Sequence, residues 1–194
     1  MAKLYFKYGV VNSSKSANAL MTIHNYKKQG MRVFVIKPEI DSRDYGEIKS
    51  RALKSSVKCN KILKKDEKIL NFLLTIETPA YLFFDVIVID ECQFLTESQV
   101  DELRYFVDKY DIPVLCYGLK TDYMTKLFEG SKRLLEVADS IQEIKTVCSC
   151  GAKAIFNGRF DKNGILIKNG EQVVIGDTDI YRPLCSKCLQ KLSM

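Results

Sequence analysis

The sequence lacks the features that mark membrane, secreted or disordered proteins. No stretch approaches 18 uninterrupted apolar residues, and the N-terminus has no apolar core followed by small residues. Prolines number only 4, and there is no internal repeat or low-complexity segment. With 46% hydrophobic residues over 194 positions, the chain is long enough to bury a core as one domain with a small second lobe. We therefore expect a globular, cytoplasmic protein with no membrane partner.

The sequence also has no strong excess of charge of one sign. The net charge of +6 arises from 30 basic and 24 acidic residues spread along the whole chain. This balance suits anionic small ligands, but it is too dilute to indicate a nucleic-acid surface. The one histidine, His24, falls in a predicted helix, and we assign it no role.

Apolar runs and helical patterns alternate along the first 147 residues. The polar, serine-rich segment from Glu39 to Asn60 shows no clean periodicity and is predicted to be a long loop. Strand, helix, strand in repetition predicts a parallel sheet wound with helices. Strands are predicted at Lys3–Lys7, Arg32–Lys37, Asp85–Ile89, Ile112–Tyr117 and Ser140–Val147, and helices at Lys15–Lys28, Lys64–Glu77 and Ser98–Tyr110.

The composition changes after Val147. Short alternating runs at Ala154–Phe160, Ile165–Lys168 and Gln172–Ile175 are separated by glycine turns and enclosed by two pairs of cysteines. We predict an α/β domain over residues 1–147 and a small β-rich lobe over residues 148–194.

The segment 8–16 follows the first strand and leads into the first helix. It fits the phosphate-loop pattern GxxxxGK(S/T) at Gly9, Lys15 and Ser16, in which backbone N–H groups surround a phosphate, the lysine reaches the outer phosphates and the hydroxyl binds magnesium. Ser14 stands where the second glycine belongs. A serine there either holds an uncommon backbone angle or keeps the loop in a helix-compatible one. An ordinary strand-to-helix turn is the alternative to a phosphate loop.

An acidic pair, Asp90 and Glu91, follows Asp85–Ile89, the clearest central strand that the sequence predicts. This is the position of the carboxylate that holds magnesium in phosphate-loop proteins, and a carboxylate one residue later has the chemistry to accept a proton from an attacking hydroxyl. The alternative is an acidic strand end that faces solvent.

Four of the 7 cysteines have a spacing that suggests metal binding. Two turn-borne pairs of thiolates give zinc a closed tetrahedral shell. The first pair is CxC where CxxC is commoner, and 34 residues separate the two pairs. The remaining three cysteines fit scattered buried thiols, and a reducing compartment argues against disulfides. The predicted zinc ligands are Cys148, Cys150, Cys185 and Cys188.

With these parts in this order, the sequence resembles a type II thymidine kinase, of the bacterial and animal cytosolic kind, nearly from end to end. The matching segments are GVVNSSKS at 9–16, EIDSR at 39–43, VIDECQF at 88–94, CYGLKTDY at 116–123, CSCG at 148–151, and VVIG at 173–176 with Tyr181 and the last cysteine pair.

The resemblance implies a RecA-like phosphate-loop domain with a zinc-binding lasso lobe, ATP- and Mg²⁺-dependent phosphorylation of the 5′ hydroxyl of thymidine, structural zinc and a homotetramer. By matching position, Glu91 is the general base, and Ser16 and Asp90 are associated with magnesium. Contacts to ATP or its phosphates are implied for Gly9, Asn12, Ser13, Ser14, Lys15, Ser16, Asp41, Arg43, Asp90 and Gln93. Contacts to thymidine are implied for Leu119, Tyr123, Phe128, Val173, Val174, Ile175, Gly176 and Tyr181, and core packing is the alternative for Tyr123 and Phe128.

Two departures from the family pattern leave other functions open. Ser14 replaces a glycine, and Asp177 stands where a second glycine is common. A catalytically weakened paralogue that only binds nucleotide is therefore one alternative. The other is a nucleic-acid-dependent ATPase, because DECQ at 90–93 resembles a helicase motif, although 194 residues leave no room for a second RecA-like domain.

Overall fold

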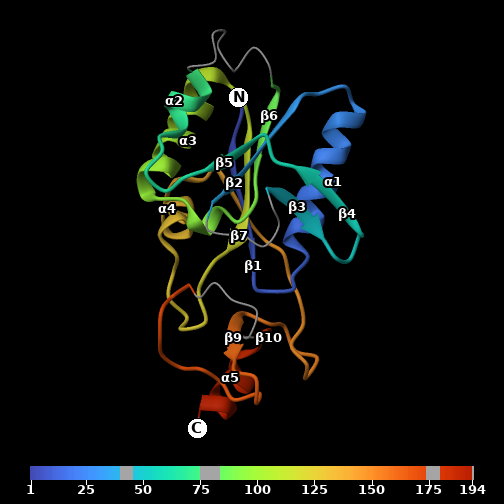
Figure 1. Ribbon diagram of the computed structural model, residues 1–194, viewed down its shortest axis with the longest axis vertical. Helices are drawn as coiled ribbons and strands as arrows, with labels where there is room; N and C mark the ends of the chain where they lie inside the picture. Colours follow the sequence, from blue (N-terminus) through green and yellow to red (C-terminus); the bar gives the residue numbers. More distant parts are fainter. Residues whose placement is uncertain (40–45, 75–83, 174–179, 194) are drawn as a thin grey trace.

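The computed structural model describes residues 1–39, 46–74, 84–173 and 180–193 (Figure 1). Among them, a central sheet has the strand order β5-β2-β6-β7-β1-β8, and each of its pairings is parallel. The predicted parallel α/β fold is confirmed. The strands are β1 (Leu4–Gly9), β2 (Val33–Pro38), β5 (Lys61–Leu63), β6 (Val86–Ile89), β7 (Val114–Leu119) and β8 (Ser140–Glu143).

Helices cover both faces of the sheet. In Figure 1, α1 (Lys15–Lys28) lies on one side, and α2 (Ile69–Leu74), α3 (Glu97–Tyr110) and α4 (Glu129–Val137) lie on the other. All four residues of β6 are buried, as expected for a strand covered on both faces. Val88 packs in the apolar cluster that α1 joins, and Ile87 packs in the cluster that α3 joins. The core therefore consists of two layers with the sheet between them.

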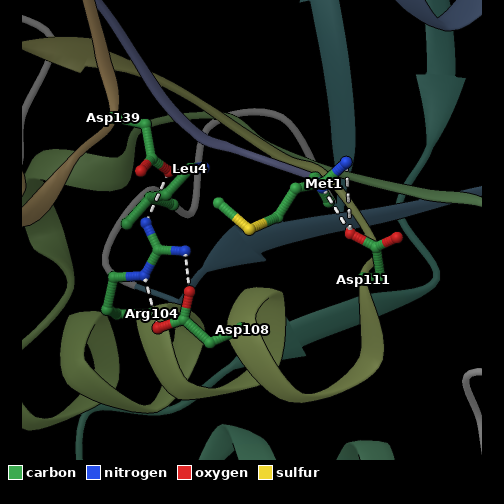
Figure 2. A network of polar contacts seen from close by, with 7 residues as sticks. Met1, Leu4, Arg104, Asp108, Asp111 and Asp139 are labelled. Atoms are coloured by element: carbon green, nitrogen blue, oxygen red, sulfur yellow. Dashed lines mark hydrogen bonds and ion pairs between the residues drawn. The ribbon is translucent and has the colours of Figure 1, made fainter.

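An arginine on α3 connects that helix to the beginning of β1 and to the residue before β8 (Figure 2). The Arg104 guanidinium donates to the carboxylates of Asp108 and Asp139. Asp139 also accepts a hydrogen bond of 2.7 Å from the backbone N–H of Leu4. One partly buried cation thus holds a helix and the start of two neighbouring strands together.

The segment predicted as a long loop, 39–60, contains a β-hairpin, so that prediction was wrong. Strands β3 (Glu47–Ser50) and β4 (Ser55–Lys58) pair antiparallel beside α1. Each is so short that a single apolar side chain, Ile48 or Val57, carries its inward face, and one residue creates no visible alternation. Residues 40–45 lie outside the described part of the chain.

Helix boundaries also differ from the sequence expectations. Helix α2 begins at Ile69 instead of Lys64, because the Gln99 side-chain amide donates to the carbonyls of Lys64 and Glu67 (2.9 and 2.8 Å) and holds that stretch outside a helix. Helices α4 and α5 (Ser186–Ser193) were not predicted. The buried face of α4 includes Gly130, which is too small to give a periodic apolar signal.

Beyond the carboxyl ends of the sheet strands lies a small unit that we call the cysteine lobe, residues 148–173 and 180–193 (Figure 1). It contains the antiparallel strands β9 (Phe156–Phe160) and β10 (Ile180–Leu184) and helix α5. Its apolar cluster consists of Cys148, Ala154, Phe160, Leu184 and Cys185, together with Val10 from the loop after β1. Within the described residues, no helix is long and apolar enough to cross a membrane.

Candidate functional site

The loop between β1 and α1 has the close approaches that a phosphate loop requires. A Cβ on Gly9 would lie 2.2 Å from the Ser13 hydroxyl oxygen and 2.7 Å from the Ile144 carbonyl oxygen, so only glycine fits there. Asn12 and Ser14 have φ angles of 57° and 63°. Of the two alternatives for Ser14, the structure has the uncommon backbone angle. The Ser14 side chain makes no capping hydrogen bond to α1.

Lys15 lies back across its own loop. Its ammonium group donates to the Val10 carbonyl at 2.8 Å and to the Ser13 hydroxyl at 3.5 Å. Burial lowers the pKa of Lys15, and the charges of Glu91 and Asp90 oppose that shift. A partly buried cation that is hydrogen-bonded to neutral oxygens and lies close to two carboxylates is well placed to turn toward a phosphate.

The acid after β6 meets the hydroxyl of the loop. The Ser16 side chain lies beside the carboxyl of Asp90 and favours its charged form, and Asp90 is 2% exposed. Burial, followed by the charge of Glu91, raises the pKa of Asp90 to about 7. Asp90 Oδ1 is a buried oxygen with no hydrogen-bond partner among the described residues. A carboxylate oxygen that lacks a partner, beside a hydroxyl, is a donor set that fits a hard cation such as Mg²⁺.

Glu91 has a strained backbone and a side chain that is held in place. Its φ and ψ are 54° and 36°, in the left-handed region. Its carboxylate accepts a 2.6 Å hydrogen bond from Gln93 Nε2, and Gln93 Oε1 accepts a 2.9 Å hydrogen bond from the Leu119 N–H. A Cβ on Gly118 would lie 2.5 Å from Gln93 Oε1, so that glycine makes room for the arrangement. Both polar atoms of the Gln93 side chain are thus engaged by protein groups.

Residues of the 119–128 segment face the cysteine lobe. Tyr123 is buried, donates its hydroxyl hydrogen to the Glu171 carbonyl at 3.2 Å and lies 5.0 Å below the Arg159 guanidinium. Phe128 is buried edge-on against Phe94, with ring centroids 5.7 Å apart. These contacts are of the kind that core packing provides.

Other residues implied at the nucleoside or phosphates are only partly described. Val173 ends a described stretch, and Tyr181 lies half-buried in β10, opposite Arg159 of β9. The remaining predicted contacts, Asp41, Arg43, Val174, Ile175 and Gly176, lie outside the described residues, as does Asp177.

The four predicted metal ligands come together in the cysteine lobe. The Sγ atoms of Cys148, Cys150, Cys185 and Cys188 lie within 4.8 Å of one another. The Cys150 and Cys185 Sγ atoms are 3.6 Å apart. That is far longer than a disulfide of ~2.05 Å, and close to the ~3.8 Å that separates two thiolates each ~2.3 Å from a tetrahedral zinc ion.

The opposite pKa shifts of two of these thiols also fit a bound cation. Backbone hydrogen bonding, first at Cys150 and then at Cys185, lowers the pKa of Cys148 to about 6. Hydrogen bonds to the neighbouring sulfurs raise the pKa of Cys188 to about 12. Cys148 and Cys188 therefore do not ionise together unless a cation compensates their charge. The site is compatible with zinc.

Sequence reasoning missed Asn157. It lies in β9, is 2% exposed, and hydrogen-bonds both the loop after β1 and the segment after β7. The only sequence signal is that asparagine is depleted in strands, so its presence in one suggests a specific use of its side chain.

A lysine and a hydroxyl at the start of α1, close to an acidic pair after β6, define a nucleotide-binding protein of the phosphate-loop class. The sequence model described as "Thymidine kinase" matches residues 2–189. The thymidine kinase of Enterobacteria phage T4 is 44% identical over 195 residues, covering 100% of this chain and 98% of that protein. The chain belongs to the thymidine kinase family.

Cellular relatives agree with this assignment. The thymidine kinase of Shewanella oneidensis is 40% identical and covers 96% of both chains. That of Yersinia pseudotuberculosis is 43% identical, covering 96% of this chain and 94% of that protein. A solved structure described as a DNA replication initiation factor has a TM-score of 0.43 and 19% identity over 74% of this chain and 40% of that chain, which is too distant to bear on function.

Proposed function

We propose that this chain transfers the γ-phosphoryl group of ATP to the 5′ hydroxyl of thymidine. The observation that carries the proposal is the position of the Ser16 hydroxyl beside Asp90, whose buried Oδ1 has no hydrogen-bond partner among the described residues. Membership of the thymidine kinase family favours this reaction over a nucleic-acid-dependent ATPase.

The reaction proceeds by positioning and charge neutralisation. Mg²⁺, held by Ser16 and Asp90, would supply charge for the phosphates. Lys15 exchanges its loop oxygens for phosphate oxygens. The bond from the 5′ oxygen to Pγ forms as the bond from Pγ to the bridging oxygen breaks, and the hydroxyl proton passes to the Glu91 carboxylate. The hydrogen bond from Gln93 orients that carboxylate.

Other roles follow from matching position. Gly9, Asn12, Ser13 and Ser14 would shape the phosphate cradle, with Asp41 and Arg43 close by. Thymidine would lie against Leu119, Tyr123, Phe128, Tyr181 and the backbone of residues 173–176.

The organisation of the molecule beyond this site completes the proposal. Residues 148–194 would act as a substrate-binding lobe beside a kinase domain of residues 1–147, with zinc as a structural ion in the cysteine lobe. A homotetramer and a cytoplasmic location are part of the same proposal.

Thymidine phosphorylation by wild type and Glu91→Gln tests the proposal. Wild type with ATP and Mg²⁺ should form thymidine monophosphate, and Glu91→Gln should lower kcat by about 100-fold or more, the usual contribution of a positioned base. Glu136→Gln, the same chemical change on the exposed side of α4, is the control and should match wild type.

Three outcomes separate the alternatives. Wild type that binds ATP and thymidine but forms no product is the weakened paralogue. Hydrolysis of ATP that DNA stimulates without nucleoside supports the ATPase. Full activity in Glu91→Gln contradicts only the assignment of the base.

A further inference from the structure

One buried side chain of the cysteine lobe makes hydrogen bonds to two separate segments of the α/β domain. Asn157 Oδ1 accepts a 2.8 Å hydrogen bond from the Val11 N–H in the phosphate loop. Its Nδ2 donates a 2.6 Å hydrogen bond to the Thr121 carbonyl, just beyond β7. With 2% of the residue exposed, water does not compete effectively for either bond.

The bond to Val11 fixes the front half of the phosphate loop. That N–H is occupied by the Asn157 side chain. The neighbouring residue Val10 accepts the hydrogen bond of the Lys15 ammonium group and packs in the apolar cluster of the cysteine lobe. Just before the lobe, the Thr146 hydroxyl donates to the Asn12 carbonyl at 3.5 Å. The lobe thus holds the stretch of loop against which Lys15 rests.

The bond to Thr121 fixes the start of the 119–128 segment. A second contact from the lobe reaches the same segment, because Gln172 Nε2 donates to Asp122 Oδ2 at 2.9 Å. Tyr123, a proposed thymidine contact, follows directly. The two hydrogen bonds of Asn157 therefore connect the side of the site where ATP would bind to the side where thymidine would bind.

We propose that Asn157 is a positioning residue, which sets the distance between the phosphate loop and the 119–128 segment. This distance determines how the two substrates are aligned. This inference rests on the proposed function. Because alignment acts on the transition state more than on either substrate alone, loss of Asn157 is expected to lower kcat while each KM changes little.

Two variants of Asn157 separate its bonds. Asn157→Leu keeps the side-chain shape and removes both bonds. Leucine is preferable to alanine, because the adjoining cleft beside Val10 and Thr121 has about 20 Å³ of room, enough for a bridging water. As a carboxylate, Asn157→Asp keeps the acceptor for the Val11 N–H and places an oxygen, which cannot donate, against the Thr121 carbonyl. Asn163→Asp, at an exposed position of the same lobe, is the matched control.

Steady-state kinetics, zinc content and hydrogen exchange of the full chain are measured for each variant. We expect Asn157→Leu to lower kcat by about 100-fold, the loss that a misplacement of about 1 Å produces, with each KM within about threefold. Asn157→Asp, which loses one hydrogen bond, should lower kcat by about tenfold. Peptides covering 8–16 should exchange faster in Asn157→Leu than in Asn157→Asp, and zinc content should stay at the wild-type level.

Several results overturn the proposal. If kcat per folded molecule is unchanged and only the melting temperature falls, Asn157 is a stabilising residue. If the KM for ATP rises and kcat stays, it serves binding. If Asn157→Leu does not fold, Asn157→Asp decides alone. If wild type forms no product, the proposed function fails instead, and exchange of peptides 8–16 and 119–128 still decides whether Asn157 holds the two segments.

Discussion

Ser14→Gly should stabilise the protein, because Ser14 holds a backbone conformation that glycine adopts without strain. With φ at 63° and ψ at 29°, the serine lies in the left-handed region. That region costs an L-residue about 1–2 kcal/mol. Glycine recovers this cost, and it loses about 0.4–1 kcal/mol through the greater freedom of the unfolded chain.

The serine hydroxyl offers nothing to set against this gain. It makes no capping hydrogen bond to α1, and the residue is exposed. The net result is a stabilisation of about 1 kcal/mol, which for a chain of this length raises the melting temperature by about 2–4 °C. Because the loop already has the shape that glycine would take, the KM for ATP should stay within about twofold, under 0.5 kcal/mol.

Urea unfolding followed by circular dichroism measures the free energy of unfolding, with Ser14→Ala as the control. Alanine has the same backbone restriction as serine, so its variant should stay within about 0.5 kcal/mol of wild type. The reasoning is refuted if Ser14→Gly unfolds at lower urea than wild type, or if alanine stabilises as much as glycine.

Three further predictions concern charge and metal. Asp90→Asn should abolish Mg²⁺-dependent activity yet stabilise the Mg²⁺-free protein at pH 8. Because folding raises the pKa of Asp90 from 3.8 to about 7, the stability of wild type falls as pH rises through that interval, by at most about 4 kcal/mol. A variant whose stability relative to wild type is no greater at pH 8 than at pH 4 contradicts this. Cys150→Ser, or a chelator, should remove zinc measured by mass spectrometry and lower the melting temperature, whereas a melting temperature that does not depend on metal argues against a structural ion. Arg104→Met should lower the free energy of unfolding by about 1 kcal/mol at pH 7, measured by urea unfolding. Although burial opposes ionisation of Asp139, the hydrogen bond from Arg104 holds the pKa of Asp139 below its usual value. The difference in stability between variant and wild type should therefore vanish as pH falls through that lowered pKa, and a difference that persists points to lost packing.

The parts of the fold that sequence predicts are those where one physical signal dominates. The strand at Asp85–Ile89 is recognisable because it is buried on both faces, and the four cysteines because zinc requires four close ligands. The hairpin within 39–60 escapes prediction, because one apolar residue per strand leaves no period.

The site follows the same rule. The proximity of Ser16 and Asp90 follows from the order of the motifs, since both lie at the carboxyl edge of one parallel sheet. The role of Gln93 as a link between Glu91 and Leu119 cannot be predicted from the order of the motifs, because it depends on a side-chain geometry that only the packed structure fixes. Asn157 is similar, since its partners lie 146 and 36 residues away.

The apolar cluster of the cysteine lobe has a consequence for the order in which the chain folds. Val10, in the loop after β1, packs in one cluster with Leu184 and Cys185, which are far from it in the sequence. Such distant pairing slows folding, because closing a long loop must precede the contact. The contact between the loop after β1 and the cysteine lobe is therefore expected to form late in folding.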